Sequence, residues 1–219
     1  MSNKLEQLAF VKPADIETRS FEIIGEELGN TTFPDKHHEL VVKRVIHTSA
    51  DFDYASNLVF SHNAVARGIE ALMGGTPIVT DTKMAAAGIN KGVLKSFGGD
   101  VLNFISDDDV VAEAKERGLT RSAISMERAA ALDRPLVFAI GNAPTALVQL
   151  YQMISEGSMV KPALIIGVPV GFVNVVESKE LILDLDVPSI VARGRKGGSN
   201  IAASICNALL YIASNDRRE

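Results

Sequence analysis

Short apolar runs constrain this chain most, because each is followed by a polar or glycine-containing turn and then by a helical pattern. Such runs occupy residues 77–79, 101–105, 135–140, 163–166 and 188–192, with a further candidate at 57–60. Between them, apolar residues recur at the three- and four-residue spacing of amphipathic helices. Strands that alternate with helices favour a parallel sheet. We therefore predict an α/β fold with a doubly wound, mostly parallel sheet and helices on both faces, formed as a single domain by residues 1–219.

Composition and charge argue against several classes of protein. Apolar residues make up 47% and charged residues 22% of the chain, and no apolar run approaches the roughly 20 residues of a membrane-spanning helix. Residues 1–6 lack the apolar core of a signal peptide, and the one cysteine, Cys206, forms no internal disulfide. Both observations indicate the reducing cytoplasm. A net charge of -5 argues against a general nucleic-acid surface.

Arg44 and His47 lie three residues apart, near the end of a helix that Pro34 and Asp35 are expected to open. Residues at this spacing share a helix face. An imidazole exchanges protons near neutral pH, and a guanidinium can bind an anionic group through two parallel hydrogen bonds. The pair therefore predicts proton transfer by His47 on an anionic substrate. The alternative is that His47 only caps the helix C-terminus, where a positive charge is favoured.

Two predicted strands end in residues that could meet a ligand. Thr80 and Asp81 follow one strand, and Gly141 and Asn142 follow another. Open α/β sheets bind ligands outside the carboxyl ends of their strands, and a glycine there lets backbone N–H groups approach the ligand. Asp81 also has a second interpretation, as the N-cap of a helix that starts at Lys83.

The stretch 193–200, Arg-Gly-Arg-Lys-Gly-Gly-Ser-Asn, stands between the last strand and the last helix. Its candidate ligand-binding residues are Arg193, Arg195, Lys196, Gly197 and Gly198. The glycines permit a close approach of the backbone, and a helix start adds N–H groups, so the stretch resembles a cradle for phosphate or carboxylate. It has neither the Lys-Ser/Thr ending of a P-loop nor a G-x-G-x-x-G fingerprint. The alternative is a solvated basic turn.

The histidines predict no metal site. His37 and His38 are adjacent and therefore point apart on a helix, and no second cluster of ligands completes a set. A solvated helix face accounts for them.

The last helix is apolar around most of its girth from Ile201 to Ile212, apart from a narrow polar stripe that includes Asn200, Asn207 and Tyr211. A helix of this kind is buried on several sides. It predicts either an oligomer interface or a helix that the rest of the chain covers.

Five stretches in a fixed order have a likeness among known proteins. They are Arg44-Val-Ile-His47, Thr80-Asp-Thr-Lys-Met-Ala-Ala-Ala-Gly-Ile89, Ala139-Ile-Gly-Asn-Ala-Pro-Thr-Ala-Leu147, Gly167-Val-Pro-Val-Gly-Phe-Val-Asn-Val-Val-Glu-Ser-Lys179 and Arg193-Gly-Arg-Lys-Gly-Gly-Ser-Asn200. Together they resemble the precorrin-8X methylmutase family, whose members are also called precorrin isomerases. The likeness runs from about Ile16 to Tyr211, and the order of several motifs makes it specific.

The resemblance implies an isomerase of cobalamin synthesis. Such an enzyme moves one ring methyl from carbon 11 to carbon 12 of precorrin-8 or cobalt-precorrin-8, giving hydrogenobyrinate or its cobalt form. The resemblance implies no cofactor and no methyl donor, a tetrapyrrole as substrate and product, and a homodimer. It places a general acid/base at His47 and substrate contacts at Ser20 and Arg44. Lys83 departs from the family's pattern, which often has an arginine there, so one anchoring contact is in question.

A flat ring fringed with carboxylates requires several cationic or N–H anchors and a wide apolar floor. The candidate cationic anchors are Arg44, Arg193, Arg195 and Lys196. Two alternatives stay open: a non-catalytic tetrapyrrole carrier on the same fold, and a Rossmann-like nucleotide or phosphosugar enzyme, for which the fingerprint is missing. Whether the ring carries cobalt is also open, because the predicted contacts lie at its periphery.

Overall fold

The computed structural model describes residues 12–215. Within them, six strands form one sheet in the order β1-β6-β5-β4-β2-β3. The strands are β1 (Leu58–Ser61), β2 (Ile78–Thr80), β3 (Val101–Leu102), β4 (Val137–Ile140), β5 (Leu164–Gly167) and β6 (Ser189–Ala192). Neighbours from β3 to β6 run parallel, while β1 pairs antiparallel with β6 at the edge. The predicted mostly parallel sheet is therefore confirmed.

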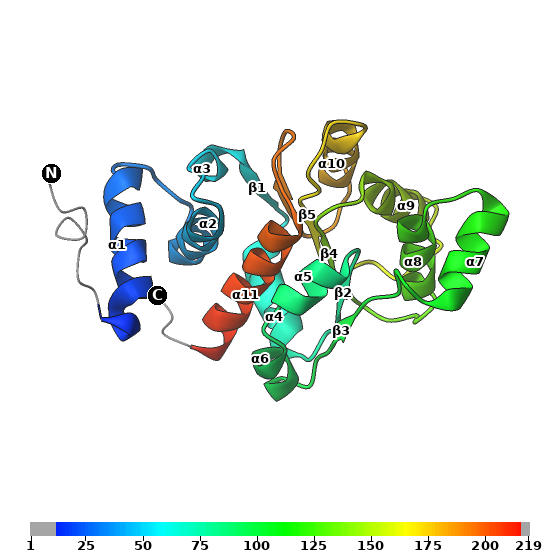
Figure 1. Ribbon diagram of the computed structural model, residues 1–219, viewed down its shortest axis with the longest axis horizontal. Helices are drawn as coiled ribbons and strands as arrows, with labels where there is room; N and C mark the ends of the chain where they lie inside the picture. Colours follow the sequence, from blue (N-terminus) through cyan, green and yellow to red (C-terminus); the bar gives the residue numbers. More distant parts are fainter. Residues whose placement is uncertain (1–11, 216–219) are drawn as a thin grey trace, which may run out of the picture.

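Helices cover both faces of this sheet (Figure 1). On one side pack α1 (Ile16–Leu28, preceded by a 3-10 turn at Pro13–Asp15), α2 (Lys36–Ser49), α3 (Tyr54–Asn57), α4 (Ala64–Met73), α5 (Lys83–Gly88), α6 (Lys91–Ser96) and α11 (Ser199–Ser214). On the other side lie α7 (Asp108–Arg117), α8 (Arg121–Ala130), α9 (Pro144–Ser155) and α10 (Val175–Leu183). The strands alternate their side chains between the two cores, as a pleated strand requires. Ile78 and Ala139 face one core, for example, and Val79 and Phe138 face the other.

Most predicted elements are present, with three differences. The strand expected at 101–105 is shortened to β3, and α3, α6 and α10 occupy regions where no helix was predicted. The N-cap of α5 is Thr82, whose side chain accepts the N–H of Ala85, so the prediction of Asp81 as that cap was wrong. The expectations for residues 1–6 lie outside the described residues, and the single domain over 1–219 stays a prediction.

The last helix, α11, is covered by its own chain. It packs against α2, α4, α5 and the sheet, and Ala202, Ile205 and Leu209 are fully buried. The packing is close: a Cβ placed on Gly88 of α5 would lie 2.8 Å from the Cβ of Ala203. The apolar girth of α11 therefore reflects a covered helix. It supplies no argument for a dimer contact there.

Asp81 joins β2 to the turn between β4 and α9. Its carboxylate is 1% exposed and accepts the backbone N–H groups of Gly141 (2.9 Å), Asn142 (2.8 Å) and Ala143 (2.7 Å). Burial raises the pKa of the Asp81 carboxyl, and the three donated hydrogen bonds oppose that rise. These N–H groups were predicted to face a ligand. They are instead used inside the protein, because a buried turn must satisfy its donors.

Replacing Asp81 with asparagine should loosen this turn. The amide would place an NH2 group against backbone donors, and each buried N–H left without an acceptor costs about 1–3 kcal/mol of unfolding free energy. Urea denaturation of Asp81→Asn measures the loss. The matched control is Asp186→Asn, because Asp186 is an exposed aspartate that pairs with Lys161. Equal stability of the two variants would contradict the role given to Asp81.

Candidate active site

Helices α1 and α2 bring Phe21, Arg44 and His47 together. The imidazole of His47 stacks on the ring of Phe21, with centroids 5.3 Å apart and planes 26° apart. The guanidinium carbon of Arg44 lies 4.6 Å from the centroid of the same ring. Arg44 and His47 therefore share a helix face, as their spacing predicted. His47 is exposed, so its imidazole is open to a ligand.

Arg44 lies deeper than His47 and already has partners. It forms an ion pair with Glu17 of α1, and its guanidinium carbon lies 5.2 Å from the ring centroid of Tyr211 on α11. Only 12% of its side chain is exposed. Arg44 thus ties α1, α2 and α11 together, and an anionic ligand at this position would have to compete with Glu17.

Ser20 directly precedes Phe21 on α1. It is half-buried, and its hydroxyl donates a hydrogen bond to the carbonyl of Ile16 at 2.8 Å. This bond to the preceding turn is common for a serine inside a helix, and the hydroxyl oxygen keeps acceptor capacity.

A pocket of about 350 Å³ joins the end of α2 to the turn between β6 and α11. Thr48 and Ser49, which follow His47, line one wall, and Lys196, Gly197 and Asn200 line another. The pocket has room for a side arm of a large ring but not for a whole macrocycle. The β6–α11 turn therefore lies close to the residues that follow His47.

The three cations of the β6–α11 turn differ in their partners. Lys196 lies between Asp51 and Asp53 at 2.6 Å from each carboxylate, which raises its pKa well above the ordinary value. Arg193 donates two hydrogen bonds of 3.1 Å to Glu180. The charges of Lys196 and Arg193 are therefore balanced within the chain. The sequence had instead predicted that both cations would be available to a ligand.

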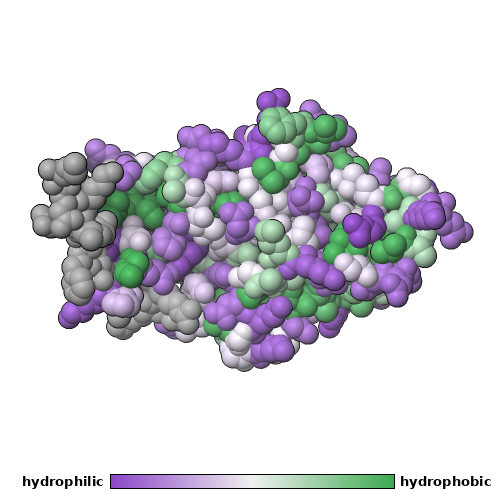
Figure 2. Space-filling view, in the orientation of Figure 1, coloured by the Kyte–Doolittle hydropathy of each residue, from purple (hydrophilic) through white to green (hydrophobic). Residues whose placement is uncertain are grey.

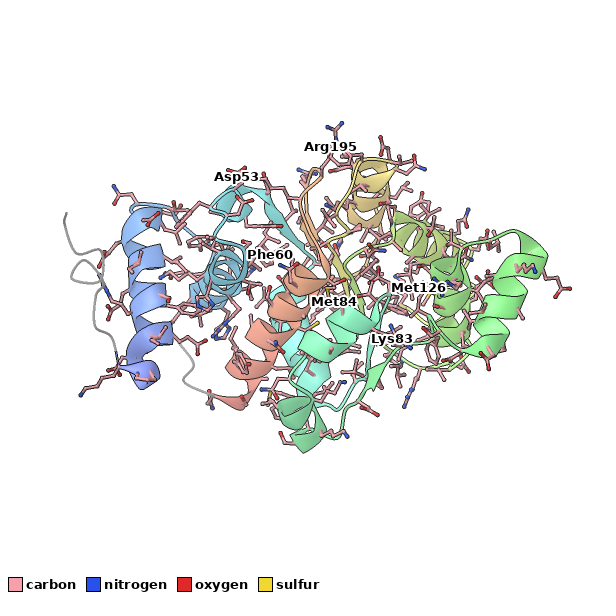
Figure 3. All side chains as sticks on the ribbon, in the orientation of Figure 1. Asp53, Phe60, Lys83, Met84, Met126 and Arg195 are labelled. Atoms are coloured by element: carbon pink, nitrogen blue, oxygen red, sulfur yellow. The ribbon has the colours of Figure 1, made fainter. Side chains whose placement is uncertain are left out.

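Arg195 has no ion pair among residues 12–215. Its guanidinium carbon lies 5.4 Å from the ring centroid of Phe172, and its side chain is exposed. Figure 3 shows Arg195 projecting at the top of the molecule, on the same side as Asp53. Of the three predicted cations in this turn, Arg195 is the one left open to an external anion.

The turn is supported from below by Lys179 of α10, which sequence reasoning did not assign. Its side chain is fully buried, and its ammonium donates to the carbonyls of Gly194 and Lys196, both at 2.8 Å. Burial lowers the pKa of Lys179 to about 8. Gly197 packs closely against the loop after β5, because a Cβ at this position would lie 2.1 Å from the carbonyl oxygen of Val168. Gly198 donates its N–H to that same oxygen at 2.9 Å.

Thr80 and Gly141 are buried and make their contacts inside the protein, with Asn103 and with Ser199. The hydroxyl of Thr80 accepts from the amide of Asn103 at 3.0 Å. A Cβ on Gly141 would lie 2.6 Å from the Cα of Ser199, so the β4–α9 and β6–α11 turns pack backbone to backbone. Neither residue offers a side chain to a ligand. The side chain of Asn142 is exposed.

Apolar side chains lie exposed in two places, beside the β6–α11 turn and at the start of α5. Phe172 and Val173, in the loop between β5 and α10, are 82% and 77% exposed, and Met84 at the start of α5 is 71% exposed. Figure 2 shows hydrophobic surface at the top of the view, around the start of α10. These side chains would pack against the apolar face of a flat ring more favourably than they remain exposed to water.

Among residues 12–215, no group of three or more His, Cys, Asp and Glu side chains could hold a metal ion. In the same part of the chain, every helix is too short or too polar to cross a membrane.

The comparisons with known proteins agree with one another. The sequence model of the precorrin-8X methylmutase family matches residues 15–212. The cobalt-precorrin-8 methylmutase of Priestia megaterium is 45% identical over 205 residues, covering 94% of this chain and 90% of that protein. The precorrin-8X methylmutase of Pseudomonas aeruginosa is 41% identical over 196 residues, covering 89% and 93% of the two chains.

A solved structure agrees as well. The crystal structure of the precorrin-8X methylmutase from Thermus thermophilus superposes with a TM-score of 0.84 at 37% identity, covering 92% of this chain and 98% of that one. Family model, relatives and solved structure each span nearly the whole molecule. The chain belongs to the precorrin-8X methylmutase family.

Proposed function

We propose that this isomerase of cobalamin synthesis moves a methyl group from carbon 11 to carbon 12 of precorrin-8 or cobalt-precorrin-8, with His47 as general acid/base. The product is hydrogenobyrinate or its cobalt form. The observation that carries the proposal is the arrangement of His47 and Arg44 on the Phe21 ring, beside a pocket that reaches the β6–α11 turn. An exposed proton donor, an arginine and an apolar surface together suit a flat polycarboxylate.

The chemistry asks little of the protein beyond proton transfer and positioning. The methyl leaves one ring carbon and joins its neighbour, so no donor is consumed and the substrate and product are isomers. Protonation of a ring atom by His47 would redistribute the π electrons and ease the shift, and such acid catalysis is typically worth about 10²–10⁴-fold. Ser20 and Arg44 would hold the ring beside the imidazole.

The other predicted site residues take three kinds of role in this proposal. Arg195 and the side chain of Asn142 face outward and would contact the ring or its carboxylates. Thr80, Asp81 and Gly141 would shape the turns from inside, because their polar groups are already bonded or buried. Arg193 and Lys196 would reach a carboxylate only by exchanging an existing ion pair.

A carrier that binds the ring without converting it is the remaining alternative, and the first experiment separates the two. The purified protein is incubated with cobalt-precorrin-8, and the absorption spectrum is followed. Conversion supports the isomerase, and a spectrum that changes only on binding supports the carrier. We also propose a cytoplasmic location, since one buried cysteine suits a reducing compartment.

His47→Ala should lower turnover by about 10²–10⁴-fold, because the proton donor is lost. Binding of the ring should persist, since the arginine and the apolar surface remain. The matched control is His37→Ala, which removes an exposed histidine from the first turn of the same helix. Turnover in His47→Ala close to that of the control would remove this imidazole from the mechanism.

Arg195→Ala should weaken product binding about tenfold at low ionic strength and less at high salt, because exposed charges are screened by salt. Arg193→Ala should have a smaller effect, since Glu180 already balances that guanidinium. Arg134→Ala, at an exposed site before β4, serves as the remote control. Equal losses for the Arg193 and Arg195 variants would contradict the distinction drawn from their partners.

We also propose a homodimer, on the basis of the family resemblance and the width of a macrocycle relative to the 350 Å³ pocket. Sedimentation equilibrium at micromolar concentration should give twice the chain mass of 23.4 kDa. The contact is expected away from α11, whose apolar side chains are used within the chain. A single species of monomer mass across the concentration range would refute the dimer.

A further inference from the structure

Lys179 is a fully buried cation that the proposed mechanism does not use. It forms no ion pair within residues 12–215, and its ammonium donates to the carbonyls of Gly194 and Lys196. Burying an ammonium without a carboxylate is costly, and two neutral acceptors compensate only in part. A cost of this kind at the base of a candidate ligand-binding turn indicates a function for the residue.

The two hydrogen bonds orient two peptide planes. The described residues contain no cis peptide bond, so each C=O points away from the N–H in its own plane. The carbonyl of Gly194 shares its plane with the N–H of Arg195, and the carbonyl of Lys196 shares its plane with the N–H of Gly197. Because Lys179 binds both carbonyls from inside, both N–H groups point away from it.

These two N–H groups have no acceptor within residues 12–215, whereas the N–H of Gly198 next to them donates to Val168. Gly197 and Lys196 line the 350 Å³ pocket, and the Arg195 side chain is exposed beside it. Gly194 has a φ of +80°, which lets the chain reverse with both carbonyls facing inward. Backbone N–H groups that point outward from one turn can together bind an anion.

We propose that Lys179 is the positioning residue of the anion site in the β6–α11 turn. By holding the carbonyls of Gly194 and Lys196, its ammonium presents the N–H groups of Arg195 and Gly197 to carboxylates of the substrate and adds a fixed positive charge beneath them. This inference rests on the proposed function, because it takes the polycarboxylate ring as the ligand.

The charged groups around Lys179 allow the inference to be tested by pH. Glu180 follows it on α10 and pairs with Arg193, while Lys196 is held by Asp51 and Asp53. Carboxylates and guanidinium groups keep their charge between about pH 7 and 9.5, and the pKa of Lys196 is raised. The pKa of Lys179 is lowered to about 8 by burial, so its ammonium is charged at pH 7 and becomes a neutral amine as the pH rises through 8.

The test compares Lys179→Met, which has no donor and no charge, with Lys179→Arg, which keeps its charge at every pH. Cobalt-precorrin-8 is the probe, and kcat and KM are measured from pH 7 to 9.5, with Kd from absorbance titration. For the wild type, KM and Kd should rise about tenfold across pH 8, the scale of losing one charge-assisted contact. Lys179→Met should have the raised values already at pH 7, with kcat nearly unchanged. Lys179→Arg should stay near the wild-type value at pH 7 and lose the pH dependence.

Lys161→Met is the control, because Lys161 is an exposed lysine paired with Asp186. A purely structural role for Lys179 would lower the melting temperature without this split between KM and kcat, and that result would overturn the inference. Wild-type pH dependence of Kd in Lys179→Arg would overturn it too, and this arm stands if the methionine variant fails to fold. A wild type that binds the probe without converting it would contradict the proposed function but not the inference about Lys179, because the comparison of Kd values needs no turnover.

Discussion

The geometry of the site depends on the hydrogen bonds that the carboxylate of Asp81 accepts. Three backbone N–H groups of the β4–α9 turn converge on it from a neighbouring strand. The turn held in this way packs against the start of α11, where Gly141 leaves no room for a Cβ beside Ser199. Thr82 then bonds to the Ser199 hydroxyl at 2.7 Å, which ties the end of β2 to the same point. The ends of β2 and β4 and the start of α11 thus meet in one polar junction, which fixes the positions of the turns that leave it.

Three of the four predicted cationic anchors already have anionic partners within the chain. Arg44 pairs with Glu17, Arg193 with Glu180, and Lys196 with two aspartates. Binding a polycarboxylate would therefore exchange one set of ion pairs for another, so its net gain per contact is smaller than the count of cations implies. Arg195 and the outward N–H groups of its turn have no such partners among residues 12–215. Each of them would therefore contribute more binding free energy per contact than a cation that is already paired. This balance also suits a chain whose net charge is -5, because the pocket needs a local positive potential against that background.

The sheet and the pairing of Arg44 with His47 could be predicted because both follow from local periodicity. Apolar runs marked β2, β4, β5 and β6, and a spacing of three residues put both side chains on one helix face, which the structure shows against Phe21. The partners of Asp81 and Lys179 could not be predicted in this way, since they lie 60 or more residues away for Asp81 and 15 to 17 away for Lys179. Their acceptors and donors are backbone groups, which carry no sequence signal. The antiparallel direction of β1 and the identity of Thr82 as a cap likewise depend on tertiary packing.

The proposed function requires that a methyl group moves within one ring and that no second reactant is consumed. The direct test is to supply cobalt-precorrin-8 carrying a ¹³C-labelled methyl group on carbon 11, with no methyl donor, and to follow the label by NMR. If the proposed function is correct, the whole signal moves to the shift of a methyl on carbon 12, at constant mass, in the wild type and not in His47→Ala. A label that stays on carbon 11 while the protein binds the ring would contradict the proposed methyl shift, as would a product that has lost the label.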